Sequence, residues 1–334
     1  MKTRSVAALA AAGALAAALL AGCSNAATDN PPPSGGTSAL PESCSDATPT
    51  VGVALPNTVN PYYIAMQKSF QDNGADLGFD VNVAIANDSD STQLSQVQAF
   101  IQQKVCAVVL NGVNSGPAAA SVAALNQAGI PVFTVNVTVD PDSLAAQNAS
   151  IVQYVGADQT AGGTEMGEQA AKDLGADASL VVGIVGDPDQ IPTNQRDQGF
   201  VEALQKANPN VTVLPTVNSK VDPNVALQVT GDLLQSNPDI NVVFADTGPG
   251  AVGAIQAIQQ SGRGASIKLY AFCAADTALT DFYVACAAQE PAEYAKTALE
   301  NLKAYLGGES VDETVLQAPK VFLSGQTPGP GEVG

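Results

Sequence analysis

The stretch VGVALPNTVNPYYIAMQKSFQDNGADLGFDVNVAIA, residues 51–86, decides the fold. Its first residues, Val51–Leu55, are a short apolar run that predicts a buried strand. A loop then leads into a helix that we expect to begin at Pro61, because proline is tolerated in a first helical turn, and to end near Leu77. A second apolar run, Val81–Ala86, predicts the next strand. The stretch is therefore a strand–helix–strand unit.

The same alternation continues from Thr50 to the C-terminal end. In the first half we expect further strands at Cys106–Leu110, Pro131–Val135 and Ile151–Val155, with helices between them. The pattern then restarts, and the later expected strands are Leu180–Val185, Val211–Pro215, Val242–Phe244, Lys268–Phe272, Ala285–Gln289 and Val315–Leu323. Strands that alternate with helices predict parallel sheets with helices on both faces. The fold class is therefore α/β, with two doubly wound parallel-sheet lobes.

The last part of the chain has one strand and one helix more than the second lobe needs. The extra helix is expected from about Pro291 to Leu306. We therefore expect the chain to cross back to the first lobe. The tail from Gln326 onward is rich in Pro and Gly, and we expect it to be frayed.

The N-terminal residues resemble an export signal. Lys2 and Arg4 precede an apolar run that is shorter than the ~20 residues a membrane-spanning helix needs. The run ends in Leu-Ala-Gly-Cys, which resembles a bacterial lipobox and predicts lipidation of Cys23; the alternative is a signal peptide that merely contains this cysteine. We expect a signal peptide over residues 1–23 and a flexible tether over residues 24–48, which are rich in Pro, Gly, Ser and Asn.

The composition excludes several classes of function. The formal net charge is −19, with only 13 Lys and Arg, so nucleic acid and anionic membrane surfaces would be repelled. The chain has no His, which removes the usual general base and the commonest metal ligand. The acidic run at residues 87–91 lacks the Gly and the distant Glu of a calcium loop and is expected to cap a helix. We expect no metal, no cofactor and no enzymatic activity.

Four cysteines remain besides Cys23, an even number in a chain with an export signal. Cys44 lies just before the first strand and Cys106 opens the third, and these strands are neighbours in a doubly wound sheet. Cys273 and Cys286 flank one short connection that we expect to be helical. We favour the disulfides 44–106 and 273–286, with four buried free thiols as the alternative.

Side chains at the carboxyl ends of the strands are the candidates for a ligand site, because ligands bind there in parallel α/β sheets. The strand-end positions are Asn60, Asn111, Asn136, Asp158, Arg196, Asp246, Thr247, Phe272, Cys273 and Gln289. Amides donate and accept hydrogen bonds, as hydroxyl groups do, and the set therefore suits a polyhydroxy ligand. Tyr62 and Tyr63 offer flat apolar faces to the C–H surface of a sugar ring.

Each of these residues also has a structural interpretation. Most tyrosines belong to a core, and asparagines are common in loops and helix caps. The repetition of amides at four separate strand ends favours the functional interpretation.

Several motifs together resemble the ribose-type periplasmic sugar-binding proteins. They are Leu55-Pro56-Asn57 through Asn60-Pro61-Tyr62-Tyr63, Val109-Leu110-Asn111, Ala128-Gly129-Ile130-Pro131-Val132, Gly156-Ala157-Asp158 through Gly162-Gly163, and Ala288-Gln289-Glu290-Pro291. The resemblance extends from about Thr50 to Leu323.

This resemblance implies a type I periplasmic-binding fold, in which three crossovers join the lobes and ligand is held between them. The crossovers would fall near Ala157-Asp158, Gln289-Glu290 and 317–319. The N-terminal lobe would then comprise residues 49–157 plus 290–317, and the C-terminal lobe residues 158–289 plus 318–334. The implied partners are a small sugar or polyol and the permease and ATPase subunits of an ABC importer, and we expect a monomer that is attached to the cell membrane only through lipidated Cys23.

The resemblance also implies which residues touch the ligand. The N-terminal lobe would supply Asn60, Tyr62, Tyr63, Asn111 and Asn136. The C-terminal lobe would supply Arg196, Phe272 and Gln289. From their strand-end positions Thr247 and Cys273 are further candidates, although a disulfide at Cys273 would make it part of the cleft wall instead.

The sequence departs from the ribose pattern at four places. Asn136-Val137 replaces an Asp-Arg pair, Thr247-Gly248 replaces Asn-Asp, Cys273 replaces an Asp, and Val221 replaces a common aromatic residue. Charge-assisted hydrogen bonds are lost at these places, with Asp246 as a candidate to replace one carboxylate. The departures favour a different pentose, a hexose, a polyol or a deoxygenated relative over ribose.

Three other functions compete with that of a transport receptor. An enzyme is disfavoured because the chain has no Gly-x-Ser-x-Gly elbow, no phosphate-binding Gly-x-x-x-x-Gly-Lys run and no cluster of metal ligands. A sugar-responsive repressor would need a basic helix-turn-helix where this chain has a signal peptide. A sensor that passes its closed form to a membrane signalling receptor would use the same cleft and stays open as an alternative.

Overall fold

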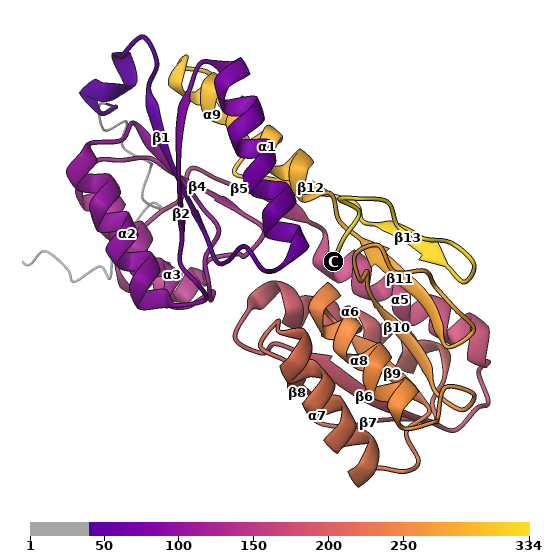
Figure 1. The fold of residues 1–334 in the computed structure, drawn as a ribbon. Coiled ribbons are helices and arrows are strands. Elements are labelled where there is room, and N and C mark those ends of the chain that lie inside the picture. The colour runs from indigo at the N-terminus through magenta and orange to yellow at the C-terminus, as the bar shows by residue number, and fades with distance from the viewer. Residues whose placement is uncertain (1–39) are drawn as a thin grey trace, which may run out of the picture. The chain divides into compact units, whose positions relative to one another are not determined.

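A computed structural model describes residues 40–334. The proposed signal peptide and Cys23 lie outside the described residues, as does most of the expected tether. Residues 38–334 form one compact unit. Within it the chain builds two sheets, which we call the N-lobe and C-lobe sheets (Figure 1).

The N-lobe sheet has six strands in the order β12-β5-β4-β3-β1-β2. They are β1 (Thr50–Leu55), β2 (Asp80–Ile85), β3 (Ala107–Leu110), β4 (Val132–Val135), β5 (Gln153–Ala157) and β12 (Thr314–Gln317). All of their pairings are parallel. This confirms the predicted doubly wound sheet. From β1 the chain adds β2 on one side and β3, β4 and β5 on the other.

The C-lobe sheet repeats this order as β13-β11-β10-β9-β6-β7, with β8 also paired to β6. Its strands are β6 (Leu180–Gly186), β7 (Val211–Val213), β8 (Val217–Asn218), β9 (Val242–Ala245), β10 (Lys268–Phe272), β11 (Tyr283–Ala288) and β13 (Lys320–Leu323). The edge strand β13 is antiparallel to β11, so this sheet is not wholly parallel.

Helices cover both faces of each sheet (Figure 1). In the N-lobe α1 packs against α9 on one face and α2 against α3 on the other, and in the C-lobe the pairs are α5 with α6 and α7 with α8. The helices are α1 (Pro61–Leu77), α2 (Asp90–Gln103), α3 (Ala118–Gln127), α4 (Pro141–Ala146), α5 (Gln159–Leu174), α6 (Ile191–Ala207), α7 (Pro223–Ser236), α8 (Gly248–Gln260) and α9 (Pro291–Leu306), and a 3-10 helix spans Glu42–Ser45.

The side chains of β1 show how the layers form. Val51, Val53 and Leu55 pack with Met66 of α1, whereas the intervening Ala54 packs with the residues of α2 and α3. Successive residues of a strand point to opposite faces, so an unbroken apolar run is what a sheet covered on both sides requires.

The chain passes between the sheets at three places. It leaves β5 for α5 at Asp158, leaves β11 for α9 at Gln289-Glu290, and leaves β12 for β13 at Ala318-Pro319. Two of these passages lie next to each other, because the Asp158 N–H donates to the Gln317 carbonyl at 3.0 Å.

Both predicted disulfides are present, Cys44–Cys106 and Cys273–Cys286. The first attaches the residues before β1 to the start of β3, so the last part of the expected tether is fixed to the N-lobe. The second closes the connection between β10 and β11. That connection is irregular instead of helical, and Asp276 within it has a positive φ of 49°.

Three further features differ from the sequence-based expectation. The run 315–323 is not one strand, because it turns at Pro319 and its halves pair in different sheets. Helix α4 and strand β8 are short elements that were not expected. The tail is not frayed, since Val333 and Gly334 are buried and hydrogen-bonded.

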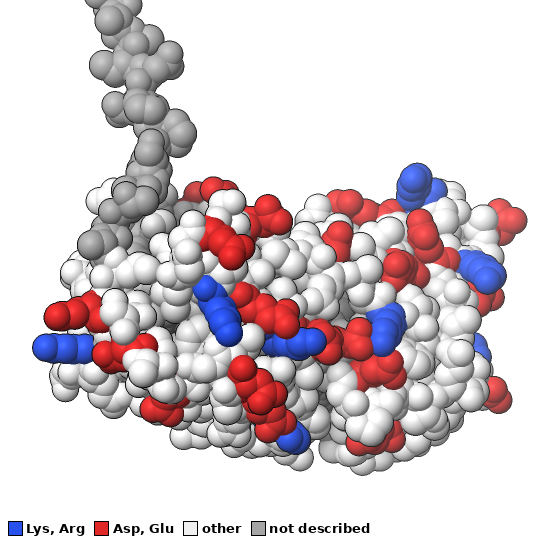
Figure 2. Space-filling view, turned by 90° about the horizontal axis from the view of Figure 1, so that it is seen from above, with Lys and Arg blue, Asp and Glu red and all other residues white. Residues whose placement is uncertain are grey.

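The surface is acidic, and its acidic side chains are spread out instead of clustered (Figure 2). Figure 2 shows Asp and Glu spread over the face in view, with Lys and Arg scattered among them. Among the helices of residues 40–334, none combines the length and apolar character needed to cross a membrane.

Candidate ligand-binding site

Residues from both lobes enclose a small chamber at the carboxyl ends of the strands. The lining residues are Asn60, Tyr62, Tyr63, Asn136, Gln190, Pro192, Thr193, Arg196, Val221, Thr247, Gln289 and Gly334. The space within measures about 20 Å³, enough for about one water molecule. In this conformation the two lobes are therefore closed on each other around a polar centre.

Helix α1 brings Asn60, Tyr62 and Tyr63 to the chamber. Asn60 is the N-cap residue, and its Oδ1 accepts from the Tyr62 N–H at 3.0 Å, so the capping and lining roles coexist. The two tyrosine rings meet edge to face with centroids 5.5 Å apart. Burial raises the pKa of both phenols, which keeps them neutral and able to donate a hydrogen bond.

Asn136 enters the chamber directly after β4. Its backbone is left-handed, with φ of 59°, a conformation that asparagine tolerates better than most residues. The Tyr154 hydroxyl donates to the Asn136 carbonyl at 2.8 Å and holds this turn in place. The side chain of Asn136 is therefore free of the turn and lines the chamber.

Among the described residues that line the chamber, Arg196 has the only charged side chain. It is 3 % exposed; its Nε donates to Gln159 Oε1 at 2.7 Å, and its Nη1 donates to the Asp246 carbonyl at 2.6 Å. A guanidinium group has five N–H donors in a rigid plane, so others remain for a ligand. Helix α5 packs closely on α6 at this point, since a Cβ on Gly163 would lie 2.1 Å from the Arg196 carbonyl oxygen. Glycine at position 163 therefore allows the backbone of Arg196 to lie against α5.

Gln289 joins the network from the crossover after β11. Its Oε1 accepts from Gln159 Nε2 at 3.3 Å, which links it to Arg196 through one side chain. Its Nε2 and the Tyr62 Oη are buried and find no hydrogen-bond partner among the described residues. Leaving a buried polar group unpaired costs about 1–3 kcal/mol, so both atoms mark places where a bound molecule would exchange hydrogen bonds.

The end of β9 supplies Thr247 and positions Asp246. Thr247 caps α8, with its hydroxyl accepting from the Gly250 N–H at 3.2 Å. Asp246 is fully buried and is absent from the chamber lining. Its Oδ2 accepts from the Asp187 N–H at 3.0 Å. Burial, and then the nearby Asp197, raise the pKa of the Asp246 carboxyl, while Arg196 opposes the shift. The Oδ1 of Asp246 is buried without a hydrogen-bond partner among the described residues, and the suggested role of Asp246 as a ligand carboxylate stays a prediction.

Asp158, like Asp246, is a strand-end candidate that is absent from the chamber lining, and three of the residues predicted to touch the ligand are absent from it as well. Asn111 is fully buried behind α1, where its Nδ2 contacts Met66 Sδ at 3.5 Å. Phe272 lies beneath Arg196, with its ring centroid 3.9 Å from the guanidinium carbon. Cys273 is in its disulfide, and its carbonyl accepts from the Gly334 N–H at 2.9 Å.

Sequence reasoning missed five lining residues, and the reasons differ. Gln190, Pro192 and Thr193 lie in the first turn of α6 or just before it, one turn ahead of the predicted Arg196. Val221 was noted only as a departure from the ribose pattern. Gly334 had no signal, because a Gly-rich tail predicts disorder rather than a buried contact.

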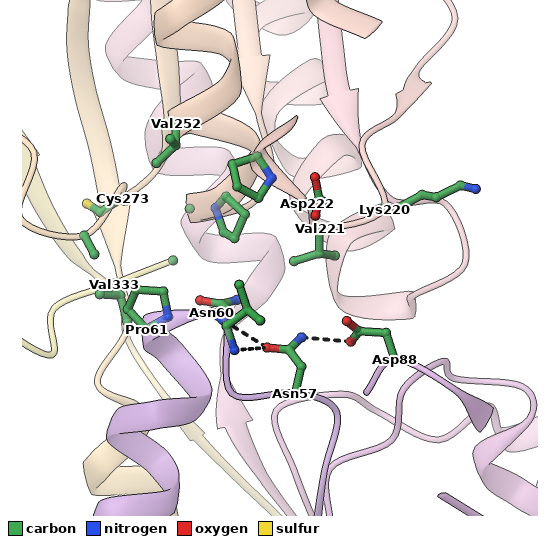
Figure 3. Close-up of a pocket in the computed structure, with 16 residues that line it drawn as sticks. Asn57, Asn60, Pro61, Asp88, Lys220, Val221, Asp222, Val252, Cys273 and Val333 are labelled. Atoms are coloured by element: carbon green, nitrogen blue, oxygen red, sulfur yellow. Dashed lines mark hydrogen bonds between the residues drawn. The ribbon is translucent and has the colours of Figure 1, made fainter. Parts of the chain in front are cut away.

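Two larger cavities adjoin the chamber, of about 150 Å³ and 200 Å³, and Asn57, Asp88, Lys220 and Val221 line both. Figure 3 shows the first, with Asn57, Asn60 and Pro61 facing Val221 and Asp222 across it. Asn57 is held by Asp88, whose Oδ1 accepts from Asn57 Nδ2 at 2.8 Å. Val221 has a positive φ of 53°, which is strained for a β-branched residue, and such strain is concentrated at functional sites.

Direct hydrogen bonds connect the lobes beside the second cavity. Ser115 Oγ of the N-lobe accepts from the Ile191 N–H at 2.9 Å, and Gln190 Nε2 donates to the Val113 carbonyl at 3.2 Å. Gln190, the N-cap residue of α6, makes no side-chain cap of its own. A serine of the opposite lobe therefore supplies the cap of this helix.

Comparison with known proteins agrees with this geometry. Residues 51–310 match the family described as periplasmic binding protein domain. A ribose import binding protein of Bacillus subtilis is 28% identical over 80% of this chain and 84% of its own length.

Solved structures extend the likeness. A solute-binding protein of an ABC transporter from Agrobacterium vitis, bound to α-D-tagatopyranose, is 25% identical with a TM-score of 0.73, over 82% of this chain and 94% of its own. A Mycobacterium smegmatis protein in complex with β-D-fucofuranose is 26% identical with a TM-score of 0.73, over 83% and 91% of the two chains. Because the family match covers most of the two-lobed unit, the chain belongs to the periplasmic binding protein domain family.

Proposed function

We propose that this protein is an extracytoplasmic receptor that captures a neutral sugar or polyol in the chamber and delivers it to the permease of an ABC importer. The observation that carries the proposal is the pair of unpartnered buried atoms, Tyr62 Oη and Gln289 Nε2. One comes from a helix of the N-lobe and the other from a crossover, and both residues line the chamber, so a ligand held there can bond to both.

The chemistry of the lining favours hydroxyl groups as the ligand's functional groups. A hydroxyl donates and accepts, and it therefore matches the amides of Asn60, Asn136 and Gln289 as well as a neutral phenol. The one positive charge of the lining is on Arg196. Asp246 favours a higher pKa of Arg196, and Arg196 in turn favours lower pKa values of Asp246 and Asp197. The relatives that bind ribose, tagatose and fucose by name support the sugar class.

Closure of the two lobes is the proposed mechanism of capture. The chamber as it stands has room for about one water molecule and is too small to hold a sugar, so the lobes must separate to admit one and close less tightly around it. Ligand contacts from both lobes then favour the closed form, which requires only a few kcal/mol of differential binding. The bond between Ser115 and Ile191 exists only while the lobes touch, and it adds to the stability of the closed form.

We also propose boundaries for the two lobes, and the positions of the crossovers support them. We assign residues 49–157 plus 290–317 to the N-terminal lobe and residues 158–289 plus 318–334 to the C-terminal lobe. Strands β12 and β13, which pair in different sheets, support the division at 317–318.

We also propose that lipidated Cys23 anchors the protein at the membrane surface. The Leu-Ala-Gly-Cys sequence at residues 20–23 supports this assignment. Labelling of cells with a radioactive fatty acid tests it: the wild-type protein should carry label and a Cys23→Ser variant should not. Equal labelling of the two would refute the assignment.

A thermal-shift screen of the purified protein tests the receptor function. We would screen D-ribose, D-tagatose, D-fucose, myo-inositol, glycerol, nucleosides and amino acids, because a ligand that binds only the folded state raises the melting temperature by mass action. We expect a shift with a sugar or polyol. A response confined to amino acids or nucleosides would keep the fold and reject the proposed ligand class.

A further inference from the structure

The C-terminal residues Val333 and Gly334, here called the C-terminal segment, connect several parts of the site. Val333 forms an antiparallel bridge with Gln289, with N–H to carbonyl distances of 2.7 Å and 3.1 Å in the two directions. The Gly334 N–H donates to the Cys273 carbonyl at 2.9 Å, and the Gly248 N–H donates to the Gly334 backbone oxygen at 3.0 Å. The segment is thus paired with a crossover and with the C-lobe at once.

The side chain of Val333 contacts the other lobe. It is 3 % exposed and belongs to the same apolar cluster as Tyr62 and Tyr63 of the N-lobe. Figure 3 shows Val333 beside Pro61, at the first turn of α1. The backbone of Val333 therefore pairs with the crossover at Gln289, while its side chain packs against the N-lobe.

The fit of the segment leaves no room for side chains at two glycines. A Cβ on Gly334 would lie 2.4 Å from Phe272 Cβ and 2.5 Å from the Cys273 nitrogen. A Cβ on Gly248 would lie 2.8 Å from the Gly334 oxygen. The segment and the end of β10 are in backbone contact, and it is the absence of side chains that permits this approach.

The segment also determines what a ligand meets at the start of α8. The first N–H groups of a helix have no partner within the helix. Here Gly334 accepts from Gly248, Thr247 accepts from Gly250, and Pro249 has no N–H. These donors are therefore occupied, and Gly334 itself lines both the chamber and the 150 Å³ cavity.

We propose that the C-terminal segment is a wall of the ligand chamber that determines affinity and specificity, by fixing Gln289 and occupying the start of α8. This inference rests on the proposed sugar-receptor function. Gln289 is the link: its backbone is bonded to Val333, while its unpartnered Nε2 is one of the two atoms that a ligand is proposed to meet.

The test displaces the segment by changing residues of the segment alone. In Gly334→Ala the added Cβ meets backbone atoms and must push the segment away, whereas in the control Gly231→Ala, within α7, the added Cβ meets no atom within 4 Å. Val333→Ala is the second displacing variant, because it weakens the apolar anchor without a clash. Hydrogen exchange at the Gly248 and Gln289 amides reports docking, and calorimetry with D-ribose, D-tagatose and D-fucose reports affinity.

We expect both displacing variants to speed exchange at the two amides and to lower sugar affinity about tenfold, with an altered order of preference among the three sugars and no change in Gly231→Ala. Faster exchange with unchanged affinity and preference would overturn the inference and leave the receptor function intact. Equally fast exchange in the wild type would overturn it whether or not a sugar binds. Protected amides in a wild-type protein that binds neither these three sugars nor any sugar or polyol of the thermal-shift screen would reject the proposed function, and the specificity role with it.

Discussion

The guanidinium carbon of Arg196 lies 3.9 Å from the centre of the Phe272 ring. A planar cation stacked on an aromatic face is held in one orientation and gains attraction from the ring. With Gln159 and the Asp246 carbonyl as its hydrogen-bond acceptors, Arg196 is fixed on three sides. Phe272 therefore serves the site as a support beneath Arg196.

Arg196→Lys should weaken sugar binding about 30–100-fold, because lysine has neither the rigid fork nor the flat face. The protein should stay folded, since the positive charge is retained. Calorimetric titration measures the affinity. Arg263→Lys is the matched control: Arg263 bonds three backbone carbonyls of the C-lobe outside the chamber, so its loss should affect stability and leave affinity unchanged.

Tyr62→Phe should change stability and binding in opposite directions. The Tyr62 hydroxyl has no partner among the described residues, so its removal should stabilise the unliganded protein by about 1 kcal/mol. Sugar affinity should fall about fivefold because one hydrogen bond is lost. Denaturant unfolding and calorimetry measure the two effects. In the control Tyr154→Phe stability should fall, because that hydroxyl is bonded to Asn136.

Ser115→Ala should disfavour the closed form. It removes the cap that Ser115 provides to α6 from the opposite lobe, a bond of about 1 kcal/mol. Affinity should fall about fivefold, mainly through faster dissociation measured by stopped flow. Ser121→Ala, a change at a buried serine within α3 of the same lobe, serves as the control. Identical dissociation rates for Ser115→Ala and the wild type would contradict a role in closure.

Asp197→Asn should make the free energy of unfolding fall less than in the wild type as the pH rises from acid to neutral. Burial raises the pKa of the Asp197 carboxyl to about 7, so the folded protein holds this proton more tightly than the unfolded chain does. The resulting stability is complete below the unfolded pKa, ~4, and is lost as the pH rises through about 7. The variant should gain about 1–2 kcal/mol near pH 8 in denaturant unfolding.

The exposed Asp232→Asn serves as the control for that pH series. It should follow the wild-type stability at every pH. A pH profile for Asp197→Asn that coincides with the wild type would mean that the carboxyl is not protonated in the folded state.

The sequence predicted the fold well where local signals and tertiary structure agree. Helix α1 has the expected bounds, Pro61–Leu77, because a proline and an Asn cap mark its start and Gly78 its end. The disulfide 44–106 was predicted because the expected sheet made Cys44 and Cys106 neighbours, and 273–286 because its cysteines flank one short connection. The split between β12 and β13 was missed because apolar periodicity does not reveal which sheet a strand joins.

The candidate site was accessible from sequence only in part. Asn60, Asn136 and Gln289 lie at strand ends, where the topology itself brings them together. Asn111 follows a strand as well, yet it is directed into the core next to Met66, and this depends on packing that no spacing rule describes. The contact of Gly334 with the chamber depends on hydrogen bonds of a tail whose composition indicates disorder.

A calorimetric titration tests the central claim most directly, with the sugar that gives the largest thermal shift added to the wild-type protein and to Arg196→Lys in parallel. We predict saturable binding to the wild type at one site per chain, with micromolar or tighter affinity, and a loss of about 30-fold or more in the variant. Absence of binding to every sugar and polyol, or equal affinity in the two proteins, would contradict a sugar site built around Arg196.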